Sequence, residues 1–125
     1  MGKTTFLRSA AYLLGKGQGI AQKRVGIADE RCEISVGIGK SGLIDVLSSM
    51  PKAEAITLLT RTMSPEIIIC DEISANEAEA VIEAQNTGIS LIASAHCENP
   101  YGLMRRGRMK MLLEQGFFYL TLFVP

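Results

Sequence analysis

Two largely apolar runs, each followed by polar residues, constrain the fold of this 125-residue chain more than any other feature, and the first of them is uninterrupted from Ile67 to Cys70. The runs lie within residues 66–70 and 89–95, and the segment between them has the start and stop signals of a helix. Uninterrupted apolar runs of this length are typical of strands that are buried on both faces of a parallel sheet. The sequence therefore predicts an α/β layer architecture with a mainly parallel sheet.

The first half of the chain alternates in the same way. Apolar residues spaced three and four apart predict a helix over residues 4–14, which a glycine-rich connection over 15–19 ends. Residues 24–29 look like a short strand, and a long loop over 30–42 follows. Helical spacing returns over 43–63, so two helices are expected there, separated by the break at Met50-Pro51.

The second half has sharper boundaries. Ser74 followed by Glu77 is a capping-box pattern, so a helix is predicted to start there and to be closed by Gly88 in the left-handed conformation. After the second apolar run, we expect a helix over 101–115 and a strand over 117–124.

Composition sets limits on the class of protein. An apolar share of 47% in 125 residues is enough for one small domain with a core. Thirteen basic and thirteen acidic residues cancel, so no global charge points to nucleic acid or to an anionic membrane. Three cysteines without paired spacing favour reduced thiols, and no apolar stretch approaches the about 20 residues of a membrane span. We expect a cytoplasmic protein that is at most peripheral to a membrane.

The chain begins with a fragment of a phosphate-binding motif. Gly2-Lys3-Thr4-Thr5 matches the last positions of G-x-x-x-x-G-K-[ST], a loop that holds phosphates with backbone N–H groups and a lysine. The helix that follows such a loop points its positive end at the anion. So short a match often arises by chance, and the first half of the loop and the strand before it are absent from the sequence.

Three further chemical groups are predicted to meet at one edge of the sheet. Asp71 and Glu72 follow the first apolar run, and His96, the only histidine, follows the second. Ligands of open α/β sheets bind beyond the carboxyl ends of the strands, and paired carboxylates suit a Mg²⁺ ion and a polarised water. Alone, such an acidic pair is more often a solvated turn, and a lone histidine more often a structural residue. Together with the N-terminal motif, they favour a nucleotide site.

Five segments, in order along the chain, resemble signatures of one family. They are Val25–Ile34, Pro51–Glu54, Arg61–Glu66, Cys70–Ile73 and residues 87–96. The first four resemble the stage III sporulation protein AA family, and the last is similar to the histidine-bearing segment of its relatives, the type II and type IV secretion ATPases. The resemblance runs from Gly2 to about the last predicted strand, so it covers nearly the whole chain.

This resemblance implies a RecA-like P-loop NTPase core over residues 1–125, truncated so that it lacks the strand before the phosphate loop. It implies ATP and Mg²⁺ as ligands, with Gly2, Lys3, Thr4 and Thr5 at the phosphates and Thr4 with Asp71 at the metal. It also implies a motor that works as a ring-shaped homo-oligomer with membrane channel proteins.

The catalytic groups that the resemblance implies are less sharply assigned. Glu72 would orient or deprotonate the attacking water, with Glu30 or Glu33 as the alternative, and His96 would sense the γ-phosphate. Phosphoryl transfer asks the protein mainly for positioning and charge neutralisation, which this set supplies. Arg31 and Arg61 would neutralise transition-state charge, across a subunit boundary or within one chain, or serve equally well as structural ion-pair partners.

Two alternatives stay open. The absent strand normally lies inside a RecA-like sheet, so its loss is expected to leave neighbouring strands without a shared partner. A nonenzymatic core that cannot close a phosphate site is therefore the second hypothesis. A hydrolase using Cys97 or Ser94 with His96 is weaker, because adjacent residues of a strand point to opposite faces.

Overall fold

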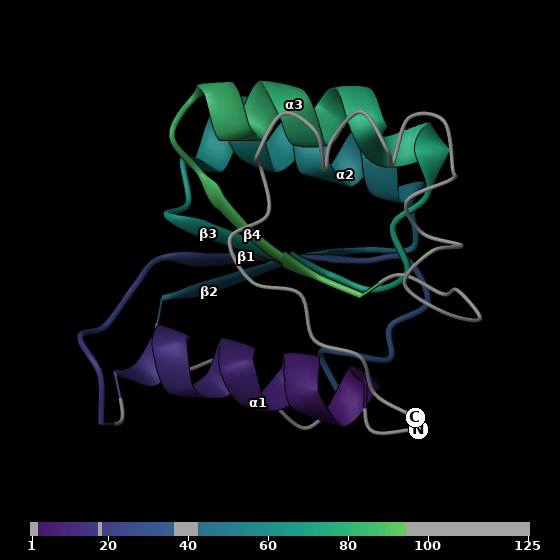
Figure 1. Cartoon of the computed structure of the whole chain (residues 1–125). Helices are drawn as coiled ribbons and strands as arrows, with labels where there is room; N and C mark the ends of the chain where they lie inside the picture. Colours follow the sequence, from purple (N-terminus) through teal and green to yellow (C-terminus); the bar gives the residue numbers. More distant parts are fainter. Residues whose placement is uncertain (1–2, 18, 37–42, 95–125) are drawn as a thin grey trace, which may run out of the picture.

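Four parallel strands form the centre of the molecule. The structure is a computed structural model that describes residues 3–17, 19–36 and 43–94. The strands pair in the order β2-β1-β3-β4, all parallel, with bounds β1 Val25–Asp29, β2 Ile44–Ser48, β3 Ile67–Cys70 and β4 Ser90–Ala93. Helix α1 (Lys3–Lys16) covers one face, and helices α2 (Lys52–Leu58) and α3 (Ala78–Asn86) cover the other (Figure 1). The predicted α/β architecture with a parallel sheet is confirmed.

The apolar run of β3 is continuous because both of its faces are covered. Ile68 belongs to the core cluster beneath α2 and α3, and Ile69 to the cluster beneath α1. Both side chains are fully buried. Successive side chains of a strand point to opposite faces, so a central strand between two helical layers needs apolar residues at every position.

Helix α1 runs two residues beyond its predicted end, through a glycine. Gly15 lies against the side chain of Ile44 on β2, and a Cβ atom at this position would collide with that side chain. The glycine therefore lets the last turn of α1 approach the sheet closely. Gly17, at φ +73°, is the residue that turns the chain out of the helix.

The prediction of a helix over residues 43–49 is wrong, because this segment forms strand β2. Ile44 and Leu47 are three residues apart, which imitates a helical period, but they face opposite layers. Ile44 packs against the cluster beneath α1 and Leu47 against the cluster beneath α2 and α3. Val46 is 38% exposed, as expected for an outer strand, so the segment lacks the continuous apolar run that identified β3.

The predicted ends of the next two helices are confirmed, whereas the second helix starts at Ala78, later than the capping-box pattern predicts. Pro51 directly precedes α2, which continues as a π-helical turn (Leu59–Met63), and Ser64 ends it at φ +45°. The backbone N–H and hydroxyl of Ser74 donate to the Glu77 carboxylate at 3.1 and 2.7 Å. A 3-10 turn (Ala75–Glu77) then leads into α3, and Gly88 follows it at φ +94°.

The sheet has no gap among the described strands. β1 is hydrogen-bonded to both β2 and β3, and β3 to β4, while β2 and β4 each pair with one strand among those described, so the expected loss of a shared partner stays a prediction. The helix and strand predicted over 101–115 and 117–124 lie outside the described residues. Of the helices that are described, none has both the length and the apolar character needed to cross a bilayer.

Candidate functional site

The carboxyl edge of the sheet brings acidic residues of two strands side by side. The pairing of β1 with β3 ends at Ala28 and Cys70, so Asp29 and Asp71 come next on neighbouring strands. Both are buried in a chain whose other buried residues are mostly apolar. Burial of carboxylates requires compensation by hydrogen bonds or by opposite charge, and the two aspartates obtain it differently.

Asp29 is satisfied entirely by hydrogen bonds from the loop that follows it. One carboxylate oxygen accepts from the backbone N–H groups of Glu33 and Ile34 at 3.0 and 3.2 Å, and the other from the N–H and hydroxyl of Ser35 at 2.9 and 2.7 Å. Burial alone would raise the pKa of Asp29, but these hydrogen bonds outweigh it and hold the pKa below its usual value. Asp29 therefore anchors the loop that carries Glu30 and Glu33, whose own side chains are exposed.

The first turn of α1 lies at the same edge of the sheet. Arg8 donates to the backbone carbonyls of Ile34 and Glu33 at 3.1 and 2.6 Å, whereas the last turn of α1 meets the start of β2 through the bond from the Leu43 N–H to Gly15. The helix thus runs antiparallel to the strands. Its N-terminal end therefore lies at the carboxyl end of the sheet (Figure 1), and no acidic residue in its first turn offsets the positive charge of that end.

The two carboxylates that follow β3 have different surroundings. Asp71 is 9% exposed, while Glu72 is exposed and adopts φ +37°, an uncommon value for a residue other than glycine. The Glu72 N–H donates to the hydroxyl of Ser94 at 2.9 Å, and the Ile73 N–H to the Ser94 carbonyl at 2.8 Å. The turn therefore holds one carboxylate inside the edge and the other in solvent.

A half-buried lysine, which the sequence did not indicate, lies in this acidic cluster. The Lys52 ammonium donates to the backbone carbonyls of Asp71 and Glu72 at 3.1 and 2.7 Å. It also lies 3.9 Å from the Asp71 carboxylate and 3.8 Å from that of Glu77, and its side chain is 12% exposed. Lys52 fell within a segment that carried the family resemblance, but nothing in its neighbourhood along the chain indicated these partners.

The charge state of Asp71 reflects this mixed environment. Burial raises its pKa, the Asp29 carboxylate adds to the rise, and the Lys52 ammonium opposes it. Among the described residues, only the backbone N–H of Asp71 itself donates a hydrogen bond to the Asp71 carboxylate, in contrast to the four donated to Asp29. Asp71 therefore keeps oxygen acceptors available at the sheet edge.

A magnesium ion at this edge would need further ligands beside the carboxylates. Within the described ranges, no group of three or more His, Cys, Asp or Glu side chains is arranged to hold a metal by itself. Mg²⁺ is usually bound by one or two carboxylates together with substrate phosphates and water, rather than by a cage of protein ligands. The Asp71 carboxylate, which is paired with Lys52, and the hydroxyl of the half-buried Thr4 are the protein oxygens that would hold such an ion.

Other predicted site residues are not brought to the acidic pair. Arg61 lies in the π-helical turn that ends near the start of β3, and its guanidinium pairs with Glu83 of α3 at 3.0 Å. Arg31 is exposed in the loop after β1. Gly2 and His96 lie outside the described residues, as does Cys97.

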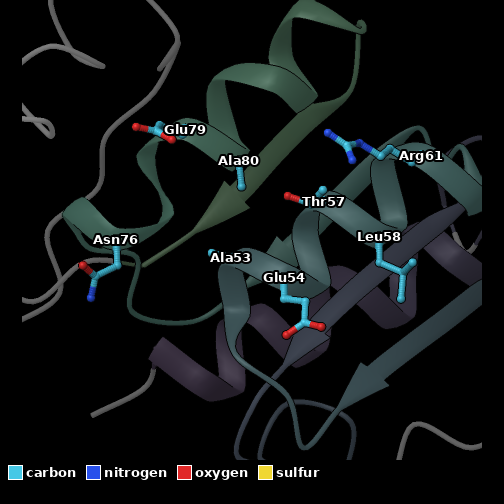
Figure 2. A pocket seen from close by; sticks show the side chains of 8 residues that line it. All are labelled: Ala53, Glu54, Thr57, Leu58, Arg61, Asn76, Glu79 and Ala80. Carbon is cyan, nitrogen blue, oxygen red and sulfur yellow. The ribbon is translucent and has the colours of Figure 1, made fainter.

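A groove between the helices of the second layer is separate from the carboxyl edge. Its volume is about 400 Å³, and it contains none of the carboxylates described above (Figure 2). The lining residues come from α2, its π-helical continuation, the 3-10 turn and α3: Ala53, Glu54, Thr57, Leu58, Arg61, Asn76, Glu79 and Ala80. Its sides carry both acidic and basic groups, so it has no single charge preference.

Comparison with known proteins identifies the family. The family model described as Sporulation stage III, protein AA matches residues 1–124. The chain is 42% identical over 125 residues to Stage III sporulation protein AA of Bacillus subtilis strain 168, an alignment that covers 94% of this chain and 41% of that protein. It is 34% identical over 113 residues to a protein of Cyanidium caldarium named Uncharacterized protein ycf45, covering 84% of this chain and 33% of that protein.

The chain thus spans less than half the length of these two relatives. No solved structure matches it. Because the family model covers almost every residue, the resemblance to the stage III sporulation protein AA family is confirmed, and the chain belongs to the Sporulation stage III, protein AA family.

Proposed function

We propose that this chain carries the Mg²⁺–ATP site of an ATP hydrolase. The observation that supports this most is that the first turn of α1 and the Asp71–Glu72 pair both lie at the carboxyl end of one parallel sheet. Thr4, in the first turn of α1, and Asp71 are 67 residues apart in the sequence. A positive helix end and a carboxylate on one edge are what a metal-bound polyphosphate requires.

In this proposal, the first turn of α1 receives the phosphates. Lys3 and the N–H groups of Thr4 and Thr5 bind the anionic oxygens, and Thr4 with Asp71 would hold Mg²⁺. The metal would supply charge neutralisation at the phosphate oxygens when bound. The burial of Asp71 limits its access to bulk water, which strengthens its interaction with a cation.

Glu72 is the group that we propose to orient the attacking water, because it is the exposed carboxylate next to Asp71. Glu30 and Glu33 are the alternatives. The loop that carries them is held by Asp29 from one side and by Arg8 from the other, so both stay near the edge. His96 would contact the γ-phosphate in the same proposal.

We further propose that the whole protein acts as a motor in a sporulation or secretion-type complex, as a homo-oligomeric ring at the cytoplasmic side of membrane channel proteins. The support is the family membership. Arg31 is exposed and is available to a neighbouring subunit, whereas Arg61 is engaged with Glu83. Arg31 is thus the better of the two candidates for a charge supplied across a subunit boundary.

Calorimetry and a phosphate-release assay test the site. We expect Mg²⁺–ATP to bind with at least tenfold lower affinity to Lys3→Ala, and Glu72→Gln to lower turnover by about 100-fold, as loss of one electrostatic group commonly does in enzymes. Asp45→Asn, which neutralises an exposed carboxylate on β2, is the matched control and should keep wild-type turnover. Glu30→Gln and Glu33→Gln, made singly, decide which glutamate acts.

Turnover that survives both Lys3→Ala and Glu72→Gln unchanged contradicts the proposed site. If the chain binds no nucleotide at millimolar Mg²⁺–ATP, the second hypothesis holds instead, namely a nonenzymatic core with the same fold.

A further inference from the structure

The Lys52 ammonium contacts two successive carbonyl groups of the turn that follows β3. The distances are 3.1 Å to the oxygen of Asp71 and 2.7 Å to that of Glu72. In an extended chain, successive carbonyls point in opposite directions. The left-handed backbone of Glu72, at φ +37°, lets both oxygens approach one cation.

This backbone conformation costs energy for a residue with a side chain, and glycine is the usual residue there. Two charge-assisted hydrogen bonds from the ammonium compensate that cost locally. On the other side of the turn, Ser94 accepts the N–H groups of Glu72 and Ile73. The turn is therefore held between a lysine of α2 and a serine after β4.

The remaining neighbours of the ammonium leave it no capacity for a ligand. The Asp71 and Glu77 carboxylates lie 3.9 and 3.8 Å away, so four oxygen atoms surround a group that has three N–H donors. Glu77 is itself fixed by Ser74. Lys52 thus differs from a lysine that binds a phosphate, because two of its three donors are taken by carbonyls and two carboxylates of the protein already neutralise its charge.

We propose that Lys52 is a positioning residue, whose ammonium sets the Asp71–Glu72 turn so that Asp71 stays inside the edge and Glu72 projects from it. The effect on catalysis rests on the proposed function, in which Glu72 orients water. The effect on the turn does not, because it follows from the contacts alone. A compact ammonium suits this enclosed position, whereas a planar guanidinium directs its donors into one fork.

Hydrogen exchange, read by NMR on the whole chain, tests the turn. We expect Lys52→Met to accelerate exchange of the Glu72 and Ile73 amides at least tenfold more than exchange of the Ile27 amide in the centre of β1. Arg24→Met is the matched control, because Arg24 donates to the carbonyl of Ser64, a residue also at positive φ, on the opposite edge of the sheet. It should leave exchange at residues 72 and 73 unchanged.

Steady-state kinetics tests the consequence for catalysis. In Lys52→Met, kcat should fall at least tenfold while KM for Mg²⁺–ATP changes less than threefold, because the variant misplaces Glu72 without removing a phosphate contact. A general loss of structure would instead move both parameters and all amides together. Lys52→Gln, which keeps two N–H donors without the charge, is the second variant if Lys52→Met is globally destabilised.

The two proposals fail separately. If the wild-type chain hydrolyses no ATP, the proposed function fails. The positioning role of Lys52 is then tested only by comparing amide exchange at residues 72 and 73 with exchange at Ile27. If exchange at residues 72 and 73 rises no more than at Ile27 in both variants, the positioning role is overturned, even where the chain is an active hydrolase.

Discussion

Replacing Asp29 with asparagine should lower the free energy of unfolding more than removal of any other single charge at this edge of the sheet. The reason is that four donors converge on this carboxylate. An amide keeps one oxygen, so the N–H groups of Glu33 and Ile34 retain an acceptor. Its NH₂ group then faces the backbone N–H of Ser35, which loses its partner, while the Ser35 hydroxyl can rotate to accept instead.

The size of the expected stability loss follows from these changes in hydrogen bonding. One buried N–H left without a partner costs about 1–3 kcal/mol, and two charge-assisted bonds that become neutral lose about half their strength. Removing the charge also relieves repulsion with Asp71, whose pKa the Asp29 carboxylate helps to raise. We therefore expect a loss of about 2–4 kcal/mol in the free energy of unfolding.

The pH dependence has a definite sign. The pKa of Asp29 in the folded chain is below the usual 3.8, so its stabilising contribution is fully present above that value. It is lost as the pH falls further, through the lowered pKa of the folded state. The difference between the wild type and Asp29→Asn should thus be constant near neutral pH and shrink below about pH 4.

Urea denaturation followed by circular dichroism measures this difference, at pH 7 and at several values below 4. Asp45→Asn is the control for the loss of one charge, because Asp45 is exposed on β2, and it should change stability by less than about 0.5 kcal/mol. If Asp29→Asn is no less stable than Asp45→Asn at pH 7, the anchoring role of Asp29 is refuted.

Three further predictions concern the fold. Gly88→Ala should cost about 1–2 kcal/mol in calorimetry, purely from its backbone at φ +94°, because an added Cβ meets no atom within 4 Å; an unchanged melting temperature would contradict this. Ile69→Ala removes a fully buried side chain between β3 and α1 and should lower the free energy of unfolding by about 2–5 kcal/mol, measured by urea denaturation. A loss below about 1 kcal/mol would mean that this layer packs loosely. Burial raises the pKa of the Cys70 thiol to about 12, so iodoacetamide at pH 8 should label the exposed Cys32 and spare Cys70 until urea is added, as peptide mass spectrometry would show.

The parts of the fold that local sequence predicts well are those whose signals lie within a few residues. The apolar run of β3 contains alternating residues for both helical layers, and the pair Ser74 and Glu77 forms its own hydrogen bonds at the start of α3. The place of Asp71 and Glu72 at the carboxyl edge follows in the same way, because a polar residue directly after a buried parallel strand has nowhere else to lie.

The segment over 43–49 shows where local reasoning fails. Its apolar residues have helical spacing, and only their packing against opposite layers, with Val25 as the partner of Ile44, makes the segment a strand. An outer strand is half exposed and so lacks the continuous apolar run that marks a central one. Strand pairing is decided by neighbours that are distant in sequence, which a period count does not include.

The candidate site also contains residues that local sequence predicted and residues that only packing placed. From its sequence alone, this chain is a parallel α/β domain of the Sporulation stage III, protein AA family, with an acidic pair at the end of a buried strand. Only the tertiary structure placed the Lys52 ammonium, 19 residues earlier in the chain, among Asp71, Glu72 and Glu77. The reason is physical: a buried charge is tolerated only where the folded chain surrounds it with partners, and those partners come from separate elements that packing alone brings together.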